Sequence, residues 1–382
     1  MATVDHVSVS FLSSHARGGG SERYLITLLE RLGADWIRDV FCLENGPFVD
    51  ELRALGLRPK VIETSHRPTA ILASAFRLRR ALRSPPDVFH ANGVKAALVV
   101  ALATIGTGVR IVWVKHDVSW DGWLARLIAL RCERVVGVSA AVLETFERKP
   151  PGRFHVVHNG IEVERGPDRR RDARLAIESA VGRKGSRAVV ALVGRLDPLK
   201  GHRELLAAAP LVAARVPGVQ FVFVGGPDPS YKAYERELRA EIDAMPEVDV
   251  FLLGHREDAA FLLNGCDVVA IPSIADRTGR GREGFSFVAL EAMVVGTPVV
   301  GYASGGLPEA VGDCGFLVRP ADRVALADAI VAIISGPDRA RTAAECGRQR
   351  VRQRFTLDRV VAAMKEQYLA ASRLPRTGRA DR

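Results

Sequence analysis

The turn at residues 194–201, Gly-Arg-Leu-Asp-Pro-Leu-Lys-Gly, places the cations Arg195 and Lys200 five residues apart. A guanidinium and an ammonium at this spacing can hold a diphosphate through charge-assisted hydrogen bonds. The turn is not a Walker loop, because its lysine is followed by glycine and histidine rather than by serine or threonine. Standing alone, the turn would favour the simpler interpretation of two solvated surface charges.

A second group of chemically useful side chains lies in the stretch 283–291, Glu-Gly-Phe-Ser-Phe-Val-Ala-Leu-Glu. Glu283 lies in a predicted loop and Glu291 about one turn into a predicted helix, so both carboxylates can face one ligand at the helix N-terminus. Two carboxylates can accept hydrogen bonds from several sugar hydroxyls. A glycosidase pair is the alternative, and its carboxyl groups would be about 5 to 9.5 Å apart.

Two glycine-rich loops precede predicted helices. The first contains three consecutive glycines, Gly18 to Gly20, and the second is Ser304-Gly305-Gly306 before a helix that starts with Leu-Pro. Such loops let backbone N–H groups approach an anion at a helix N-terminus. A simple turn is the alternative in both places.

His116 lies at the C-terminal tip of a predicted strand, where a side chain can meet a substrate. Most single histidines are structural, and it is this position that makes His116 a candidate. Trp113, Trp120 and Trp123 cluster around it in the sequence and could stack on a sugar or an apolar group. Core packing is the simpler interpretation for Trp113, because it lies within the strand.

Short β-rich runs alternate with amphipathic helical patterns, which predicts βαβ units and parallel sheets. The strand-like runs lie at 7–12, 39–43, 61–63, 87–90, 110–115, 134–138, 155–157, 188–193, 220–224, 249–253, 268–271 and 298–301. After the seventh run the strand pattern is lost and charged residues, Gly and Pro become frequent, as in an interdomain linker. We therefore expect two α/β domains, a linker between them, and a C-terminal helix with a basic tail that can dock back on the first domain. The expected boundaries are 1–165, 166–187, 188–355 and 356–382.

The composition of the 382-residue chain is that of an α/β globular protein, with 48% hydrophobic, 26% charged and 6% aromatic residues. The net charge of +10 suits nucleic acid, an anionic membrane surface or phosphorylated ligands. The five cysteines are scattered and odd in number, which argues against a disulfide or a structural zinc site. No apolar run reaches the length of about 20 residues that a transmembrane helix needs, and no signal peptide is recognised. These features predict a cytoplasmic protein.

Taken together, these motifs resemble the retaining glycosyltransferases of family four, which have the GT-B fold. The resemblance spans almost the whole chain, from Gly18-Gly19 to the final helix. Its most specific elements are the turn 194–201, the two glutamates of 283–291, and Ser-Gly-Gly-Leu-Pro-Glu at 304–309. It implies an α/β architecture of two Rossmann-like domains whose parallel sheets face each other across an interdomain cleft.

The resemblance also implies roles for individual residues. Arg195 and Lys200 would hold the donor diphosphate and neutralise the leaving group. Glu283 would contact the transferred sugar, Glu291 would accept hydrogen bonds from the ribose, and His116 would contact the sugar near the reaction centre. The other implied donor contacts are Gly18, Gly19, Gly284, Phe285 and Ser286. The family commonly has glycine at the last of these positions.

The resemblance implies a nucleoside-diphosphate sugar as co-substrate and no other cofactor. No Asp-x-Asp occurs in the sequence, so a divalent metal bridging the diphosphate is not required, and enzymes that this chain resembles generally lack one. The acceptor is expected on the N-terminal domain, with Trp120, Trp123 and Asn92 as candidate contacts. Asn92 stands where the family frequently has a second histidine, which leaves the role of that position open.

The segment 71–83 predicts an amphipathic helix with most of its arginines on the polar side. Its apolar face would consist of Ile71, Leu72, Ala75, Leu78 and Leu82. Two interpretations are open. A solvated helix of the domain is the simpler, and peripheral docking on the inner face of the plasma membrane, as in some family members, is the other.

The resemblance thus predicts a retaining hexosyltransferase that moves a sugar from a UDP- or GDP-sugar to a hydroxyl of a saccharide, a lipid-linked saccharide or a natural product. Two alternatives use the same fold: a sugar-nucleotide epimerase or hydrolase, and a catalytically silent partner subunit that binds a nucleotide sugar. Nucleic-acid binding is disfavoured, because the basic residues are not interleaved with aromatic residues. The sequence identifies neither the base, the sugar, the acceptor nor the oligomeric state.

Overall fold

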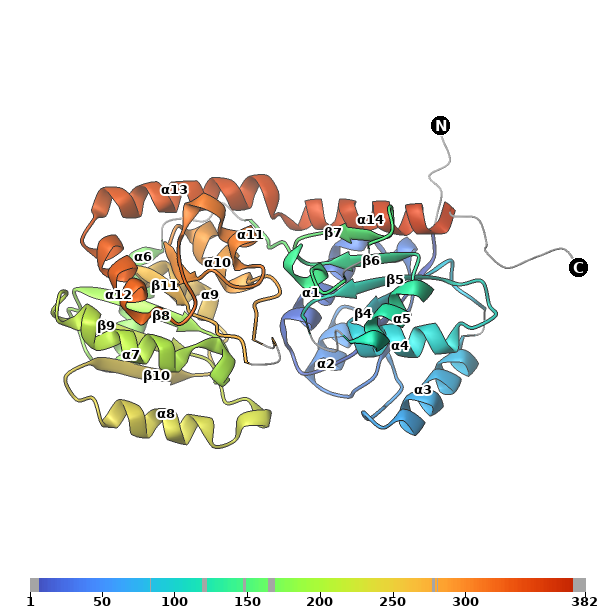
Figure 1. Ribbon diagram of the computed structural model, residues 1–382, viewed down its shortest axis with the longest axis horizontal. Helices are drawn as coiled ribbons and strands as arrows, with labels where there is room; N and C mark the ends of the chain where they lie inside the picture. The colour runs from blue at the N-terminus through green and yellow to red at the C-terminus, as the bar shows by residue number, and fades with distance from the viewer. Residues whose placement is uncertain are drawn as a thin grey trace, which may run out of the picture. The chain divides into compact units, whose positions relative to one another are not determined.

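The computed structural model describes residues 7–82, 84–118, 122–146, 149–163, 169–276, 279 and 281–373. The chain divides into two compact units (Figure 1). The first unit contains Met1–Gly160 and Leu357–Arg382, and the second contains Ile161–Thr356. The chain therefore leaves the first unit once and returns to it with its last helix.

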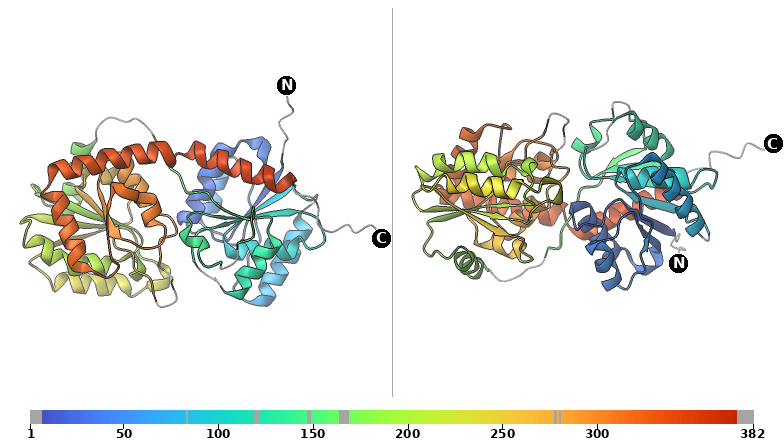
Figure 2. Two further views of the ribbon diagram at one scale, coloured as in Figure 1. Left: turned by 45° about the horizontal axis from the view of Figure 1, so that its top comes forward. Right: turned by 90° about the horizontal axis from the view of Figure 1, so that it is seen from below.

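The described residues of the first unit form a seven-stranded parallel sheet with the strand order β3-β2-β1-β4-β5-β6-β7. Its strands are β1 (Val9–Ser13), β2 (Ile37–Cys42), β3 (Lys60–Val61), β4 (Val88–Asn92), β5 (Arg110–Lys115), β6 (Arg134–Gly137) and β7 (Phe154–Val156). One face carries the helices α1 (Gly20–Leu32), α2 (Pro47–Ala54) and α14 (Leu357–Arg373). The other face carries α3 (Pro68–Ala81), α4 (Val94–Ala103) and α5 (Trp123–Arg131) (Figure 2).

In the second unit, the part of the chain that is described forms a six-stranded parallel sheet with the order β10-β9-β8-β11-β12-β13. Its strands are β8 (Ala188–Val193), β9 (Val219–Val224), β10 (Asp249–Gly254), β11 (Val268–Ile271), β12 (Val299–Tyr302) and β13 (Phe316–Val318). One face carries α7 (His202–Ala213), α8 (Tyr234–Asp243) and α12 (Arg323–Ile334). The remaining helices are α6 (Arg170–Val181), α9 (Ala259–Leu262), α10 (Phe287–Val295), α11 (Leu307–Val311) and α13 (Pro337–Arg354).

Helices on both faces bury these sheets, which explains why their strands are continuous apolar runs rather than alternating patterns. Strand β8, Ala-Val-Val-Ala-Leu-Val, is buried over its first five residues. The core of the second unit packs Phe221 and Tyr302 from the sheet against Leu205 of α7 and Ile330 of α12. The prediction of an α/β protein with parallel sheets is confirmed. The short strand β13, three residues long and half-buried, was not predicted.

The segment 166–187, predicted as a linker, contains helix α6. Its residues Ala173 and Ile177 are buried four positions apart on one face, and they give the helix a packing side. A Cβ atom on Gly265 would lie 2.6 Å from the backbone of Ala173, so this glycine permits the close packing of the helix. The second unit therefore begins before α6, and the charged composition of the segment reflects the exposed side of a helix.

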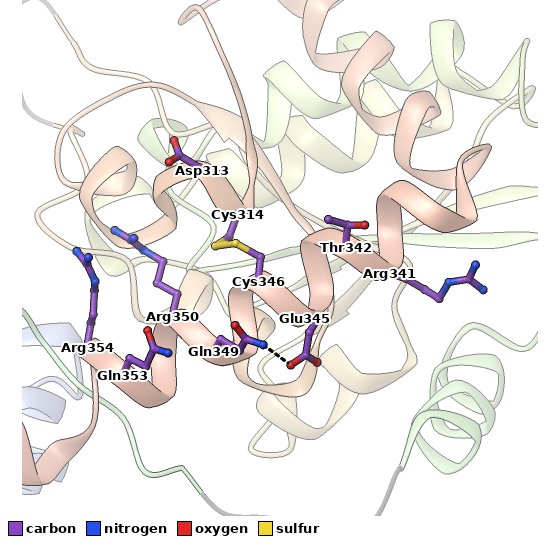
Figure 3. Close-up of a pocket in the computed structure, with 10 residues that line it drawn as sticks. All are labelled: Asp313, Cys314, Arg341, Thr342, Glu345, Cys346, Gln349, Arg350, Gln353 and Arg354. Atoms are coloured by element: carbon purple, nitrogen blue, oxygen red, sulfur yellow. Dashed lines mark hydrogen bonds between the residues drawn. A yellow bond between two sulfur atoms is a disulfide. The ribbon is translucent and has the colours of Figure 1, made fainter.

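Cys314 and Cys346 form a disulfide across 32 residues, joining the 3-10 turn Gly312–Cys314 to α13 (Figure 3). The prediction of no disulfide is therefore wrong for this pair, because a spacing this wide carries no local motif. The pair lies in a surface pocket together with Arg341, Arg350 and Arg354.

The other cysteines, Cys42, Cys132 and Cys266, are free and buried. Burial raises the pKa of the Cys42 and Cys266 thiols to about 12, so these thiols stay protonated.

Helix α3 buries Ile71, Ala75 and Leu78 against the first unit. The expected apolar face included Leu72, but this side chain is 58% exposed. Phe76, one turn later, is 60% exposed. The buried stripe of the helix is thus narrower than the sequence pattern indicates.

Helix α14 is tied to the first unit by a buried polar contact. The hydroxyl of Tyr368 and Nδ1 of His90 on β4 are hydrogen bonded at 2.6 Å, and neither residue is exposed. Burial lowers the pKa of His90 to about 3, so the imidazole is neutral. The last helix of the chain therefore completes the core of the first unit.

We expect Tyr368→Phe to lower the free energy of unfolding by about 1–3 kcal/mol, because it leaves a buried imidazole nitrogen without its partner. Denaturant unfolding would measure this loss. Tyr24→Phe is the matched control: Tyr24 in α1 is 2% exposed, and its hydroxyl makes no hydrogen bond to any described residue. Equal losses in the two variants would show that the contact with His90 contributes nothing specific.

Candidate functional site

Both sheets reverse their strand order beside their first strand, and in doubly wound folds ligands bind at the carboxyl ends of strands at such a point. The reversal lies between β1 and β4 in the first unit and between β8 and β11 in the second. The loop with Gly18 and Gly19 follows β1, and the turn with Arg195 and Lys200 follows β8. The topology therefore places these predicted site residues where a ligand is expected.

Lys200 and Glu283 form a direct ion pair in the second unit, with Nζ 2.8 Å from Oε1. Ser273, which follows β11, donates its hydroxyl to the same oxygen at 2.6 Å. Burial alone would raise the pKa of Glu283, but the charge of Lys200 and hydrogen bonds from Lys200 and Ser273 lower it below its usual range. Glu283 is thus a buried carboxylate that is held ionised.

Two glycines let the surrounding loops meet. A Cβ atom on Gly201, whose φ is +80°, would lie 1.9 Å from the carbonyl oxygen of Pro272. A Cβ atom on Gly305, whose φ is +58°, would lie 2.2 Å from the carbonyl oxygen of Glu283, and Gly306 donates its N–H to that oxygen at 2.7 Å. The Ser-Gly-Gly loop therefore fixes the backbone of Glu283, and the Gly306 N–H that the sequence offered to a phosphate is already used.

Arg195 is anchored by a residue that the sequence analysis missed. Its Nη1 lies 2.6 Å from Oδ2 of Asp228, which follows β9 and is 4% exposed. The other oxygen of Asp228 accepts the N–H of Ser230 at 2.8 Å. The remaining N–H groups of the Arg195 guanidinium make no hydrogen bond to described residues, so an exposed cation is held in place with donors to spare.

The other predicted donor-binding residues lie at the start of α10. Gly284 and Phe285 precede this helix, and Ser286 is its N-cap, with Oγ accepting the N–H of Ala289 at 3.3 Å. Glu291 lies in the second turn and is 8% exposed. The helix N-terminus adds a partial positive charge beside Lys200.

In the first unit, His116 is hydrogen bonded to Asn92, with Nε2 and Oδ1 2.6 Å apart. The amide of Asn92 donates from Nδ2 to the carbonyl of Ser21 at 3.0 Å, so its oxygen faces the imidazole and Nε2 must be the donor. Burial lowers the pKa of His116 to about 4, which keeps the ring neutral. Asn92, a candidate acceptor contact that is 1% exposed, therefore orients His116.

Gly18, with a φ of +77°, and Gly19, the N-cap of α1, form the loop after β1. The buried carboxylate of Glu22, which the sequence analysis missed, accepts the N–H of Arg17 at 3.0 Å and the hydroxyl of Ser21 at 2.6 Å. By accepting these two hydrogen bonds, the carboxylate holds the glycine loop in its conformation.

The tryptophans do not form one surface. Trp113 is fully buried in the core, and Trp123 begins α5 with 72% of its surface exposed. Trp120 lies outside the described residues.

Within the described ranges, His, Cys, Asp and Glu side chains form no group of three or more that could hold a metal ion. None of the helices in these ranges combines the length and the apolar composition that crossing a membrane requires.

Two family models match the chain, one in each half. Residues 18–165 match the model described as Glycosyltransferase Family 4, and residues 187–336 match the model described as Glycosyl transferases group 1.

Two mycobacterial relatives are similar in sequence. A D-inositol 3-phosphate glycosyltransferase of Mycobacterium marinum is 38% identical over 46% of this chain and 35% of that protein. An alpha-maltose-1-phosphate synthase of Mycolicibacterium smegmatis is 29% identical over 80% of this chain and 79% of that protein. The match to the first relative thus spans only about a third of its length.

Solved structures share the fold over nearly the whole chain. HepE of Anabaena, in complex with UDP and glucose, has a TM-score of 0.81 and 25% identity, covering 95% of this chain and 99% of that one. A sucrose-phosphate synthase of Thermosynechococcus elongatus has a TM-score of 0.74 and 22% identity, with coverages of 95% and 98%. The predicted GT-B fold is confirmed. Because family models match both halves of a chain with this fold, the protein belongs to glycosyltransferase family 4.

Proposed function

We propose that the protein is a retaining glycosyltransferase that moves a sugar from a nucleoside-diphosphate donor to a hydroxyl acceptor. The observation that carries this proposal is the Lys200–Glu283 ion pair at the carboxyl edge of the second sheet, in which the Glu283 side chain is 11% exposed. Complexes of HepE with UDP and with UDP-glucose support a uridine diphosphate sugar as the donor. We therefore prefer a UDP-sugar to a GDP-sugar.

The reaction sets the demands on the site. The bond between the anomeric carbon and the diphosphate oxygen breaks, the acceptor oxygen bonds to that carbon, and the acceptor proton is released. Negative charge grows on the diphosphate, and preorganised cations and helix dipoles stabilise it most effectively. Arg195 and Lys200 are such cations.

The hydrogen bonds assign Lys200 and Glu283 complementary roles. The ammonium of Lys200 has three donors, and among the described residues Glu283 takes one of them, which leaves two for the diphosphate. Glu283 stays ionised and can accept hydrogen bonds from hydroxyls of the transferred sugar. Glu291 serves the ribose in this proposal.

In the first unit, we assign Gly18 and Gly19 to the diphosphate and His116 to the sugar. Because the Nε2–H of His116 is used by Asn92, only the Nδ1 lone pair of the neutral ring remains. His116 can therefore accept a hydrogen bond from a sugar hydroxyl, but it cannot donate one.

We expect Arg195→Ala and Lys200→Ala to lower kcat by about 10²- to 10³-fold, because each removes a cation from the developing charge. Proton NMR of the reaction with UDP-glucose and a panel of acceptors would report both turnover and the anomeric configuration of the product. Arg215→Ala, which removes an exposed arginine paired with Asp328 at 2.7 Å, is the matched control and should keep full turnover. Near-normal turnover in either test variant would refute the assignment, and inversion at the anomeric carbon would refute retention.

A second expectation concerns the nucleotide itself. At about 100 times its dissociation constant, UDP should stabilise the protein by roughly 2.7 kcal/mol, which a thermal melt detects. Guanosine, adenosine and thymidine diphosphates serve as comparisons, and the shift should disappear in Arg195→Ala and Glu291→Ala. Stabilisation by GDP alone would overturn the choice of base, and stabilisation by no nucleotide would argue for a different function.

Gly305→Ala should lower turnover by about 10²-fold, because its Cβ would push the backbone of Glu283 away and misplacement near 1 Å has an effect of this size. Gly218→Ala is the control: its φ of +80° is equally unfavourable for alanine, but the nearest atom to its Cβ is 3.7 Å away. Steady-state kinetics and melts of both variants separate the two effects. If both variants lose only stability, the Ser-Gly-Gly loop does not position Glu283.

A further inference from the structure

A small cavity of about 70 Å³ lies in the first unit at the N-terminus of α4. Its wall includes Ser14 after β1, Gly93 and Lys95 at the start of α4, and Lys115 and His116 at the end of β5. A cavity needs about 10–15 Å³ for each water, so this one has room for roughly five to seven heavy atoms. That is the size of a phosphate group and smaller than a whole sugar.

Lys95 brings a buried ammonium to this cavity. Its side chain is 5% exposed, and Nζ lies 3.0 Å from Oε1 of Glu44. Among the described residues this is the only hydrogen bond of the ammonium, so two of its three donors remain. A buried charged group with unused donors is costly unless a ligand or water satisfies it.

The start of α4 adds further donors. Ser14, 4% exposed, accepts the N–H of Ala96 through Oγ at 2.9 Å, and its own hydroxyl hydrogen has no acceptor among the described residues. The N–H groups of Val94 and Lys95 also make no hydrogen bond to any residue described, as is usual for the first residues of a helix. Four groups in the cavity wall can thus donate to one ligand, and the helix dipole favours an anion there.

The charges around the cavity also favour an anion. Glu44 is shared by Lys95, by Arg17 at 3.2 Å and by His15 at 3.1 Å. Burial would raise the pKa of Glu44, but its hydrogen bond and charge interaction with Lys95 lower it to about 2, so this carboxylate stays ionised.

Two further charged residues line the cavity. Lys115, 2% exposed, is the second permanent cation of the wall after Lys95, and its Nζ donates to the backbone carbonyl of Asp117. The exposed carboxylate of Asp117 lies at the rim. Of the residues that line the cavity, Lys95 and Lys115 are permanent cations and Asp117 is the carboxylate. The carboxylates of Glu44 and Glu22 lie behind this wall, where they accept hydrogen bonds from Lys95 and Ser21.

We propose that this cavity binds a phosphate group of the acceptor, so that the acceptors are phosphorylated sugars or polyols rather than neutral ones. The inference rests on the proposed function and narrows its acceptor to a substrate class. The donor diphosphate is assigned to Arg195, Lys200 and the loop with Gly18 and Gly19, and none of these residues lines this cavity. His116, assigned to the sugar, lines the same cavity, so a phosphate held here keeps its carbon skeleton near that side chain.

The test compares glucose, glucose 6-phosphate, glucose 1-phosphate and glucuronate as acceptors for the wild-type protein, and titrates inorganic phosphate by calorimetry. A phosphate ester should be the better acceptor, and inorganic phosphate should bind and compete with it. Lys95→Met and Ser14→Ala should each raise the KM of the phosphate ester by about 10- to 100-fold, the usual effect of losing a hydrogen bond to a charged group. Their effect on neutral sugars should be small.

Two further variants keep the test interpretable. Lys95→Met leaves Glu44 without its closest cation, so Lys95→Met/Glu44→Gln should show the same KM effect without that imbalance. Lys60→Met is the matched control: this lysine is paired with Asp39 at 2.7 Å, is 49% exposed, and lies outside the cavity. It should leave the KM for the phosphate ester unchanged.

UDP binding, followed by thermal melts, separates the two proposals. If UDP stabilises the wild type and Lys95→Met alike but neutral sugars are the preferred acceptors, the cavity inference is wrong and the proposed function stands. If Lys95→Met abolishes UDP binding, the cavity serves the donor and the inference is equally overturned. If UDP never binds but calorimetry shows phosphate binding lost in Lys95→Met and Ser14→Ala, the cavity binds phosphate and the transferase proposal fails.

Discussion

A carboxylate that is removed from water stays ionised only where a cation and hydrogen-bond donors replace its hydration. Glu283 meets this condition through Lys200 and Ser273, and the arrangement of the second unit follows from it. The two partners come from the loops after β8 and β11, which lie next to each other because the strand order reverses between these strands. Gly201 is required because the backbones of these two loops touch, and Gly305 is required because the loop after β12 touches the backbone of Glu283.

The first unit also holds a carboxylate ionised with cations, but here the positive charges outnumber the carboxylate. Glu44 lies among more positive charges than it can neutralise, and the buried Lys95 retains unused donors. By contrast, the hydrogen bonds from Asn92 to Ser21 and from His116 to Asn92 each have a defined donor and acceptor. The side of the cavity with His116 is therefore held in a fixed geometry, whereas the side with Lys95 has donors that a ligand would satisfy.

The sequence was most informative where function depends on residue type at short range. The strands at 110–115, 188–193 and 268–271 begin and end where their apolar runs predict. The turn with Arg195 and Lys200 stood out because two cations and two glycines share eight residues.

Partners distant in the sequence left no such signal. Asp228 lies in a loop that contains no recognisable motif, and it reaches Arg195 only because β8 and β9 are neighbours in the sheet. The disulfide between Cys314 and Cys346 is hidden for the same reason.

For Lys95 the sequence does contain a signal, although the sequence alone did not identify this residue as part of a site. It is the one charged residue in the otherwise apolar helix Val-Lys-Ala-Ala-Leu-Val-Val-Ala-Leu-Ala. A charge in the first turn of such a helix is ordinarily read as a surface residue. Only its burial, its pairing with Glu44 and the cavity beside it distinguish it from one.

A phosphate anchor would also have a consequence for catalysis. Binding energy from a part of the substrate that does not react can be used to orient the part that does. A neutral sugar offers only hydroxyls that resemble one another, so several orientations bind about equally well. A phosphate held by Lys95, Ser14 and the start of α4 selects one orientation, and thereby selects which hydroxyl receives the transferred sugar. On this argument the cavity determines the regiochemistry of the product as well as the affinity for the acceptor.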